Sequence, residues 1–142
     1  MIKDIKYKNP GSSSTTRNEK IHNIIFDKRK DAEYLVAQEI INLVKENNKK
    51  NKKTVLGLAT GFSPIGVYKS LIQLHKEEKV SFKNVVTFNL DEYYGMNKNH
   101  KESYHSFMEE KLFKVINVKR ENIHIPNGEL EKKNIDGFCT DY

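Results

Sequence analysis

Two short apolar segments on either side of an amphipathic one restrict most strongly what this chain can fold into. The first spans residues 54–59, and the second, at 85–90, is rich in β-branched and aromatic residues. The segment between them carries side chains at helical spacing, namely Ile65, Tyr68, Leu71, Ile72 and His75. A strand, a helix and a strand at this spacing form a βαβ unit, whose two strands are parallel. The sequence therefore predicts an α/β fold built on a mainly parallel sheet.

A strand-to-helix turn is expected between the first strand and this helix. Thr60-Gly61 closes the strand, and Ser63 is a good N-cap residue. Pro64 suits the first helical position, because its ring supplies a helical φ where no N–H is needed. The helix is expected to fade by Lys79.

The segments before this unit predict an extension, a strand and a helix. Residues 1–20 are expected to form a flexible N-terminal extension, because lysines mixed with Pro10, Gly11 and a polar run show no sustained period. Residues 24–26 form a short apolar run that predicts a strand. The helix that should follow has an apolar side formed by Ala32, Leu35, Val36, Ile40, Leu43 and Val44.

The segments after the unit predict two more helices and one more strand. Helical spacing connects Tyr104, Phe107, Met108 and Leu112. Residues 122–125 are expected to form a short strand, followed by a turn at Asn127-Gly128 and a final helix.

The formal net charge of +6 does not by itself indicate a nucleic-acid partner. Much of the positive charge lies in one lysine-rich run at 45–53, where a solvated connector explains it. No aromatic-rich recognition motif accompanies the charge, so nucleic-acid binding is disfavoured. An excess of basic over acidic residues also suits an anionic small-molecule substrate.

The sequence shows neither a membrane-spanning segment nor a secretory signal. No apolar run is long enough to cross a bilayer, so we expect a soluble, cytoplasmic protein with no membrane partner. The single cysteine, Cys139, has no second cysteine for an internal disulfide, and no cysteine and histidine cluster has metal-ligand spacing. A metal site is therefore not expected.

Two features that carry chemistry fall at the carboxyl ends of the predicted strands, where ligands bind in open α/β sheets. The turn at 60–64 offers free backbone N–H groups and a positive helix end, which favour a phosphate. Asp91 leaves the end of the neighbouring strand toward the same rim. Each feature also has a structural explanation: a βα turn needs a glycine and a cap, and an aspartate can cap or pair with a lysine.

These segments together resemble the glucosamine-6-phosphate deaminase family. The matching stretches are Leu56-Gly57-Leu58-Ala59-Thr60-Gly61, Ser63-Pro64 and Val85-Val86-Thr87-Phe88-Asn89-Leu90-Asp91-Glu92-Tyr93. Ser103-Tyr104, Ser106-Phe107-Met108 and Asn122-Ile123 continue the resemblance, which runs from about Ile24 to the C-terminus. The segments also resemble the deaminase-like half of bacterial proteins that carry a second, deacetylase-like domain.

The resemblance implies an aldose–ketose isomerisation coupled to loss of ammonia, which turns glucosamine 6-phosphate into fructose 6-phosphate without a cofactor. It makes Asp91 the catalytic general base that moves a proton between C2 and C1 of the opened sugar. The turn formed by Thr60, Gly61, Phe62 and Ser63 matches the family's phosphate loop. Glu92 and Tyr93 are expected to contribute to the substrate site.

Two features depart from the family pattern. Phe62 stands where many relatives place a glycine or serine, so a positive φ there would strain the backbone and the ring would crowd the phosphate. The family's later segment, with its ring-opening histidine and acidic partners, has no counterpart here, so we expect this chain alone to be an incomplete, inactive fragment. Most of its histidines are expected to be structural or solvent-facing, and His75 falls on the apolar side of a helix.

The expected architecture is thus a Rossmann-like, mainly parallel sheet with helices on both faces. Residues 21–142 would form the N-terminal part of a deaminase-like domain, and the resemblance implies a homo-oligomer for the full-length enzyme. Two alternatives stay open: a related sugar-phosphate enzyme such as a 6-phosphogluconolactonase, and a non-catalytic sugar-phosphate-binding module. The stretch at 88–93 favours the deaminase over the lactonase.

Overall fold

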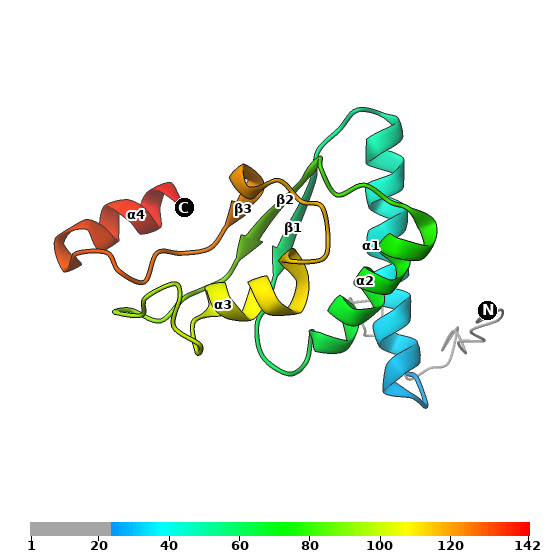
Figure 1. Cartoon of the computed structure of the whole chain (residues 1–142), viewed down its shortest axis with the longest axis horizontal. Helices are drawn as coiled ribbons and strands as arrows, with labels where there is room; N and C mark the ends of the chain where they lie inside the picture. Colours follow the sequence, from blue (N-terminus) through cyan, green and yellow to red (C-terminus); the bar gives the residue numbers. More distant parts are fainter. Residues whose placement is uncertain (1–23) are drawn as a thin grey trace, which may run out of the picture.

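A three-stranded parallel sheet forms the centre of the computed structural model, which describes residues 24–142 (Figure 1). Its strands are β1 (Thr54–Leu58), β2 (Val85–Asn89) and β3 (Ile123–His124), in the order β1-β2-β3. The predicted βαβ unit and its parallel pairing are confirmed. The extension expected at residues 1–20 lies outside the described residues.

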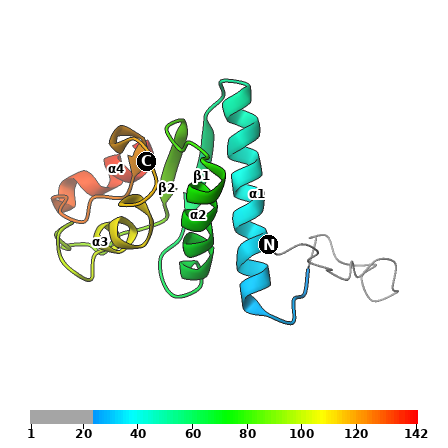
Figure 2. The same ribbon diagram turned by 45° about the vertical axis from the view of Figure 1, so that its right-hand side comes forward.

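Four α-helices and three shorter helical segments surround the strands in the described part of the chain. The α-helices are α1 (Arg29–Lys49), α2 (Ile65–Glu78), α3 (Tyr104–Met108) and α4 (Ile135–Asp141). A π-helical turn, Glu109–Phe113, continues α3, and two 3-10 turns are Arg120–Asn122 and Lys132–Asn134. α1 and α2 lie side by side, and α4 lies at the opposite end of the molecule (Figure 2).

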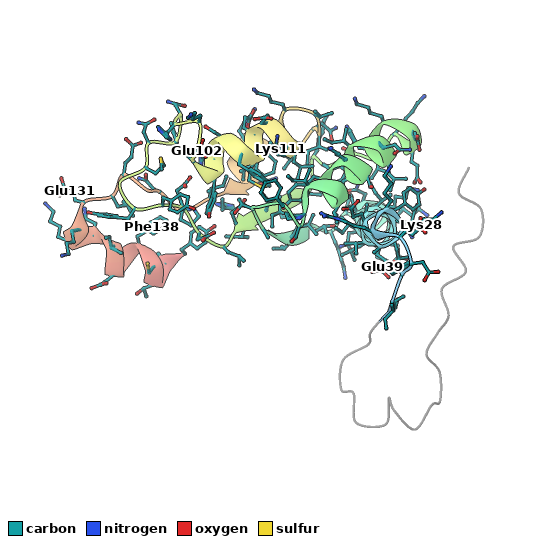
Figure 3. All side chains as sticks on the ribbon, turned by 90° about the horizontal axis from the view of Figure 1, so that it is seen from below. Lys28, Glu39, Glu102, Lys111, Glu131 and Phe138 are labelled. Carbon is teal, nitrogen blue, oxygen red and sulfur yellow. The ribbon has the colours of Figure 1, made fainter. Side chains whose placement is uncertain are left out.

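The two faces of the sheet have different surroundings. Thr54, Leu56 and Leu58 of β1 point toward the core shared with α1, α2 and the α3 region, of which α2 and α3 lie over the strands in Figure 3. Phe88 points to the opposite face, where its ring stacks on His124 at 4.5 Å and meets Tyr142 edge-on at 5.8 Å. Tyr142, which directly follows α4, also donates a hydrogen bond to the Asn89 carbonyl at 2.7 Å. The expected α/β fold with a parallel sheet and packed helices is confirmed, while on the second face Val55 stays 62% exposed.

One contiguous core holds the helices to the sheet. Its fully or nearly fully buried members are Ala37, Ile41, Val44, Leu58, Tyr68, Leu71, Leu74, Val80, Phe82, Val85, Met108, Leu112, Phe113 and Ile116. The loop before β2 is tied to this core, because the Phe82 N–H donates to Asn117 Oδ1 at 2.7 Å.

The expected strand at residues 24–26 is wrong. This segment is irregular and leads into α1, and the Ile25 side chain is 86% exposed. A three-residue apolar run gains little as a strand unless a neighbour completes its hydrogen-bond ladder, and no described strand pairs with it.

α1 is present as predicted, but its buried stripe is rotated from the expected one. Ala37, Ile41 and Val44 are fully buried against α2 and the core, whereas Val36 and Leu43 are close to half exposed. Two packed helices share only a narrow stripe at i, i+4 and i+7, so apolar residues flanking that stripe stay accessible.

α2 begins one residue later than predicted. Pro64 is the N-cap residue, its carbonyl accepts from the Tyr68 N–H at 2.9 Å, and the Ser63 side chain makes no cap hydrogen bond. The predicted end is confirmed, since Lys79 adopts a left-handed φ of +52°. His75 is a structural residue as expected: Nδ1 lies 2.6 Å from the Val80 carbonyl oxygen, and its ring meets Phe82 edge-on.

We predict that Leu71→Ala destabilises the chain strongly, because Leu71 of α2 is 1% exposed in the core. The lost burial and the cavity should lower the free energy of unfolding by about 2–5 kcal/mol, measured by urea denaturation. Leu43→Ala, on the accessible side of α1, is the matched control and should change it by no more than about 0.5 kcal/mol. Equal effects of the two substitutions would contradict the packing described here.

Candidate active site

The register of β1 and β2 brings the two predicted chemical features to one rim of the sheet. Leu58 pairs with Asn89, so Thr60 and Asp91 each lie two residues beyond the same pair. The buried Asn89 side chain donates from Nδ2 to the Leu58 carbonyl at 3.3 Å and ties the two strand ends together. Neighbouring strands are about 4.8 Å apart, so the turn and Asp91 leave the sheet from adjacent positions.

The turn after β1 presents free backbone donors. Gly61 has a φ of +92°, a conformation that glycine adopts without strain. Among the described residues, none accepts a hydrogen bond from the N–H groups of Gly61, Phe62 or Ser63. These groups precede the N-terminus of α2, whose dipole favours an anion. The turn therefore has the donors that a phosphate requires.

Phe62 does not carry the backbone strain that its position suggested. The only non-glycine residues with positive φ in the described chain are Asn51 and Lys79, so the left-handed position belongs to Gly61. The Phe62 ring is 89% exposed at the rim, where it has room to turn away from a ligand.

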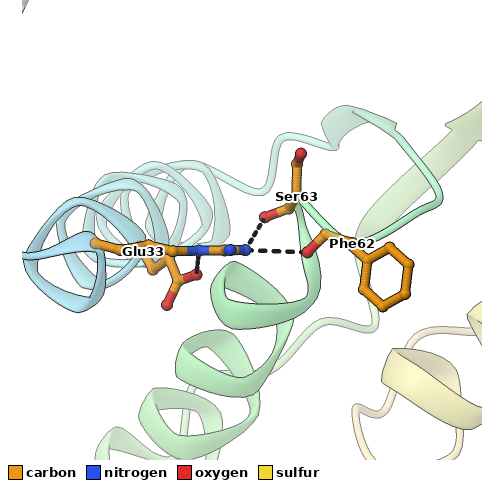
Figure 4. Close-up of polar contacts among 4 residues, drawn as sticks. Glu33, Phe62 and Ser63 are labelled. Carbon is orange, nitrogen blue, oxygen red and sulfur yellow. Dashed lines mark hydrogen bonds and ion pairs between the residues drawn. The ribbon is translucent and has the colours of Figure 1, made fainter.

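The turn is held from behind by two side chains. The buried Tyr68 hydroxyl donates to the Ala59 carbonyl, and burial raises the pKa of Tyr68 to about 12. Arg29 Nη2 donates to the carbonyls of Phe62 at 3.1 Å and Ser63 at 3.4 Å, while its Nε pairs with Glu33 at 2.6 Å (Figure 4). Sequence reasoning missed Arg29, because it lies 33 residues before the turn and belongs to no recognisable motif.

Asp91 is exposed, and its carboxylate is not engaged by any hydrogen bond or ion pair within residues 24–142. This arrangement does not support the explanation that Asp91 caps the following segment or pairs with a surface lysine. A carboxylate left free at the rim can accept a proton from a ligand held by the adjacent turn.

Glu92 performs the capping task instead. Its Oε1 accepts from the N–H groups of Tyr93 at 2.9 Å and Tyr104 at 3.0 Å, and its Oε2 accepts from the His105 N–H at 3.0 Å. Ser103 Oγ caps the same helix by accepting from the Ser106 N–H. The Glu92 carboxylate thus stabilises the positive N-terminus of α3 and fixes the direction of the chain that leaves Asp91.

Tyr93 lies at the rim beside Tyr104. The two rings are 4.8 Å apart, and their hydroxyl oxygens lie within hydrogen-bond distance at 3.1 Å. The hydrogen bond with Tyr104, which stabilises the neutral phenol when Tyr93 donates it, and a smaller contribution from charge repulsion raise the pKa of Tyr93 above its ordinary value.

The loop that follows Asp91 rests on the turn at Asn127-Gly128. The Gly95 N–H donates to the Gly128 carbonyl at 2.7 Å. A Cβ on Gly128 would lie 2.4 Å from the Tyr93 carbonyl oxygen and 2.7 Å from that of Met96, so only glycine fits. The sequence predicted this turn but not its contact with the loop that follows Asp91.

Two cavities lie near the loop but not at the rim itself. One of about 500 Å³ runs between α3 and β3, and its neighbour of about 290 Å³ is lined by Glu92, Met96 and Gly128 among others. Neither cavity is lined by Asp91 or by residues 60–63. Within residues 24–142 there is no cluster of three metal-ligand side chains, and none of the helices there is long and apolar enough to cross a membrane.

We predict that Glu92→Ala destabilises the chain and loosens α3, because two backbone N–H groups of that helix would lose their acceptor. The free energy of unfolding should fall by about 1–3 kcal/mol. Amide hydrogen exchange of Tyr104 and His105 should become faster. Glu102→Ala, which removes an exposed carboxylate, is the control and should change stability by no more than about 0.5 kcal/mol. Unchanged exchange at both amides would show that Glu92 does not cap the helix.

The chain matches one family model and curated relatives from several bacteria. Residues 27–142 match the family model described as Glucosamine-6-phosphate isomerases/6-phosphogluconolactonase. A glucosamine-6-phosphate deaminase of Borrelia garinii subsp. bavariensis is 50% identical over 107 residues, which cover 75% of this chain and 39% of the relative. One from Thermoanaerobacter sp. is 46% identical over 107 residues, with 75% and 42% covered.

Solved structures share the fold. A monomeric glucosamine-6-phosphate deaminase superposes with a TM-score of 0.75 at 35% identity. The superposition covers 82% of this chain and 46% of the deaminase chain. A 6-phosphogluconolactonase of Thermotoga maritima superposes with a TM-score of 0.62 at 21% identity, over 83% of this chain and 49% of the lactonase chain. At this identity the similarity is one of fold alone.

The chain spans 39% to 42% of the length of these two curated deaminase relatives. The family model covers all the elements from α1 to α4, with the turn at 60–63 and Asp91 at the rim between them. The chain therefore belongs to the family of glucosamine-6-phosphate isomerases and 6-phosphogluconolactonases, and it is homologous to glucosamine-6-phosphate deaminases.

Proposed function

We propose that this chain supplies the phosphate-binding turn and the general base of a glucosamine-6-phosphate deaminase. The observation that carries the proposal is the juxtaposition at the rim: Thr60 and Asp91 each follow the pair Leu58 and Asn89 by two residues. The identity of 46% to 50% to deaminases supports this activity over others in the family. Residues 21–142 would then be the N-terminal part of the deaminase-like domain.

The turn at 60–63 would bind the substrate's phosphate through the free N–H groups of Gly61, Phe62 and Ser63 and the positive end of α2. Binding the unreactive end of the sugar fixes the position of the reacting end. The side chains of Thr60 and Ser63 add hydroxyl donors beside these amides.

Asp91 would act on the opened sugar. Its carboxylate takes the proton from C2, the electrons of that C–H bond form the C1=C2 double bond of an enolamine, and the aldehyde oxygen takes up a proton. Return of the proton to C1 and loss of a proton from the nitrogen give an imine at C2, whose hydrolysis by water releases ammonia and leaves fructose 6-phosphate. C1 is reduced as C2 is oxidised, so the sequence of steps needs no cofactor.

Glu92 and Tyr93 have different parts in this proposal. Glu92 positions the loop through α3, because its carboxylate is already occupied by three backbone N–H groups. Tyr93, half exposed beside Tyr104, is the one of the two whose side chain is open to solvent and can meet a substrate.

The alternatives have less support. The likeness to the Thermotoga maritima lactonase is one of fold, at 21% identity. A sugar-phosphate-binding module without catalysis would keep the turn but would have no use for an unengaged carboxylate at Asp91. On the resemblance to deaminases we also propose a cytoplasmic location and, for the full-length enzyme, a homo-oligomer; fusion to a deacetylase-like domain is a further variant of the family.

The phosphate site is tested by titrating glucosamine 6-phosphate or fructose 6-phosphate into the isotopically labelled chain. The backbone amide signals of Gly61, Phe62 and Ser63 should shift, because these N–H groups gain an anionic acceptor. Shifts confined to the lysine run at 45–53 would show charge attraction without a built site and would reject the proposal.

The role of Asp91 is tested in a chimera that carries this chain's matched segment in place of that of the Borrelia garinii subsp. bavariensis deaminase. Asp91→Asn should lower turnover at least about a hundredfold, because an amide cannot accept the C2 proton. KM should stay within a few-fold, since the phosphate contacts remain. Exchange of the C2 proton with deuterium from solvent reports this step directly, and an unchanged exchange rate would exclude Asp91 as the base.

A further inference from the structure

We infer that Arg29 is a positioning residue for the phosphate turn, one that turns the Ser63 N–H toward the ligand. The inference rests on the proposed function of the turn at 60–63 and adds a residue from a distant helix to it. Arg29 is the first residue of α1, and its guanidinium reaches the carbonyls of Phe62 and Ser63.

The geometry of the peptide bond links these hydrogen bonds to the direction of the Ser63 N–H. The described chain has no cis peptide bonds, and in a trans peptide the C=O and the following N–H point in opposite directions. Because the Phe62 carbonyl points to Arg29, the Ser63 N–H points away from it. The Ser63 carbonyl is joined to Pro64, which has no N–H. Arg29 therefore keeps the carbonyl oxygens of Phe62 and Ser63 on its own side of the turn. The Ser63 N–H lies on the other side, where the inferred site has the ligand.

The opposite orientation of the Phe62–Ser63 peptide would be unfavourable for phosphate binding. A carbonyl oxygen carries partial negative charge, so turning it toward the phosphate would replace an attraction by a repulsion. Rotation of this peptide changes ψ of Phe62 and φ of Ser63, neither of which is the left-handed torsion of Gly61. The hydrogen bonds from Arg29 to the carbonyls of Phe62 and Ser63 oppose this rotation from outside the turn.

Helix stability does not explain an arginine at this position. A cation in the first turn opposes the helix dipole, which favours acidic residues there. The pair Arg29 and Glu33 also has the basic residue N-terminal to the acidic one, the weaker of the two orders at i, i+4. The Arg29 side chain is 66% exposed, so its ion pair adds little to folding.

Glu33, which packs against Gly66, holds the Arg29 guanidinium in one position. Glu33 is mostly buried, and its carboxylate occupies the space in which a Cβ on Gly66 would lie, with Cδ only 1.9 Å from that point. Glu33 thus rests on the first turn of α2 and holds Arg29 Nε at 2.6 Å. The guanidinium thus bonds to Glu33 and to the carbonyls of Phe62 and Ser63, contacts that are drawn as dashed lines in Figure 4.

The experiment compares the full chain with Arg29→Ala, Arg29→Lys and Gly66→Ala. Arg120→Ala is the matched control, because Arg120 is an equally exposed arginine that pairs with Glu109 on the π-helical turn, away from residues 60–63. Inorganic phosphate and fructose 6-phosphate are titrated against the amide signals of Gly61 to Ser63. ¹⁵N relaxation of Phe62 and Ser63 is measured without ligand, and thermal unfolding is followed for every variant.

Arg29→Ala should weaken both ligands about five- to tenfold, the size of one or two lost charge-assisted hydrogen bonds, and should lower the order parameters of the free turn. Arg29→Lys should recover part of the affinity, since it keeps the charge but not the planar fork. Gly66→Ala should also weaken binding by displacing Glu33, while thermal stability is kept or raised because alanine is the better helix former. Arg120→Ala should leave both readouts unchanged.

The outcomes separate two failures. If the wild-type amides of Gly61 to Ser63 do not respond to either ligand, the proposed function of the turn fails, and this inference fails with it. If the wild type binds but Arg29→Ala binds equally well with an equally ordered turn, only the role of Arg29 is overturned. Full recovery by Arg29→Lys with a turn that stays disordered would mean that charge alone acts, which also overturns the positioning role.

Discussion

The parallel pairing of β1 with β2 is the constraint on which the rest of the site depends. A shift of one residue would move every side chain of β2 to the other face and would take Val85 out of the core. The same pairing sets Thr60 and Asp91 at equal distances beyond the strand ends. Asn89 Oδ1 and Thr87 Oγ1 are buried in this pairing without a hydrogen-bond partner among the described residues, which lowers the stability of the fold.

Both segments of the candidate active site are irregular, and each is held by contacts from elsewhere in the chain. The turn at 60–63 is held by Tyr68 from the following helix and by Arg29 from the preceding one. The loop after Asp91 is held by Glu92 at the N-terminus of α3 and by Gly128. In each case a side chain or a glycine replaces the hydrogen bonds that a strand or helix would have supplied, so the loops are ordered while their outward-facing groups stay free.

The sequence predicted the parts of the fold that rest on local patterns. The βαβ unit follows from apolar period and turn residues, and the end of α2 at Lys79 follows from fading periodicity. Contacts across the chain were not predictable in this way: the hydrogen bonds of Arg29 to residues 62–63 and of Glu92 to α3 join segments far apart in sequence. The stripe of α1 was placed wrongly for the same reason, since only packing against α2 decides which apolar side is buried. The rim location of Asp91 was predicted because strand order determines it.

Exposure of the rim has a mechanistic consequence. Asp91 is open to solvent, and the preceding Leu90 and the Phe62 ring of the turn at 60–63 are exposed apolar side chains. Water competes for a carboxylate in this position and weakens every electrostatic contact with a substrate. A general base at such a rim therefore gains most when another surface covers Phe62 and Leu90 and excludes water. The deaminase relatives extend well beyond the 39% to 42% of their length matched here. The turn at 60–63, with Arg29 and Tyr68 behind it, has the groups that would position a substrate. Exclusion of water requires a further surface, because the rim is exposed among the described residues.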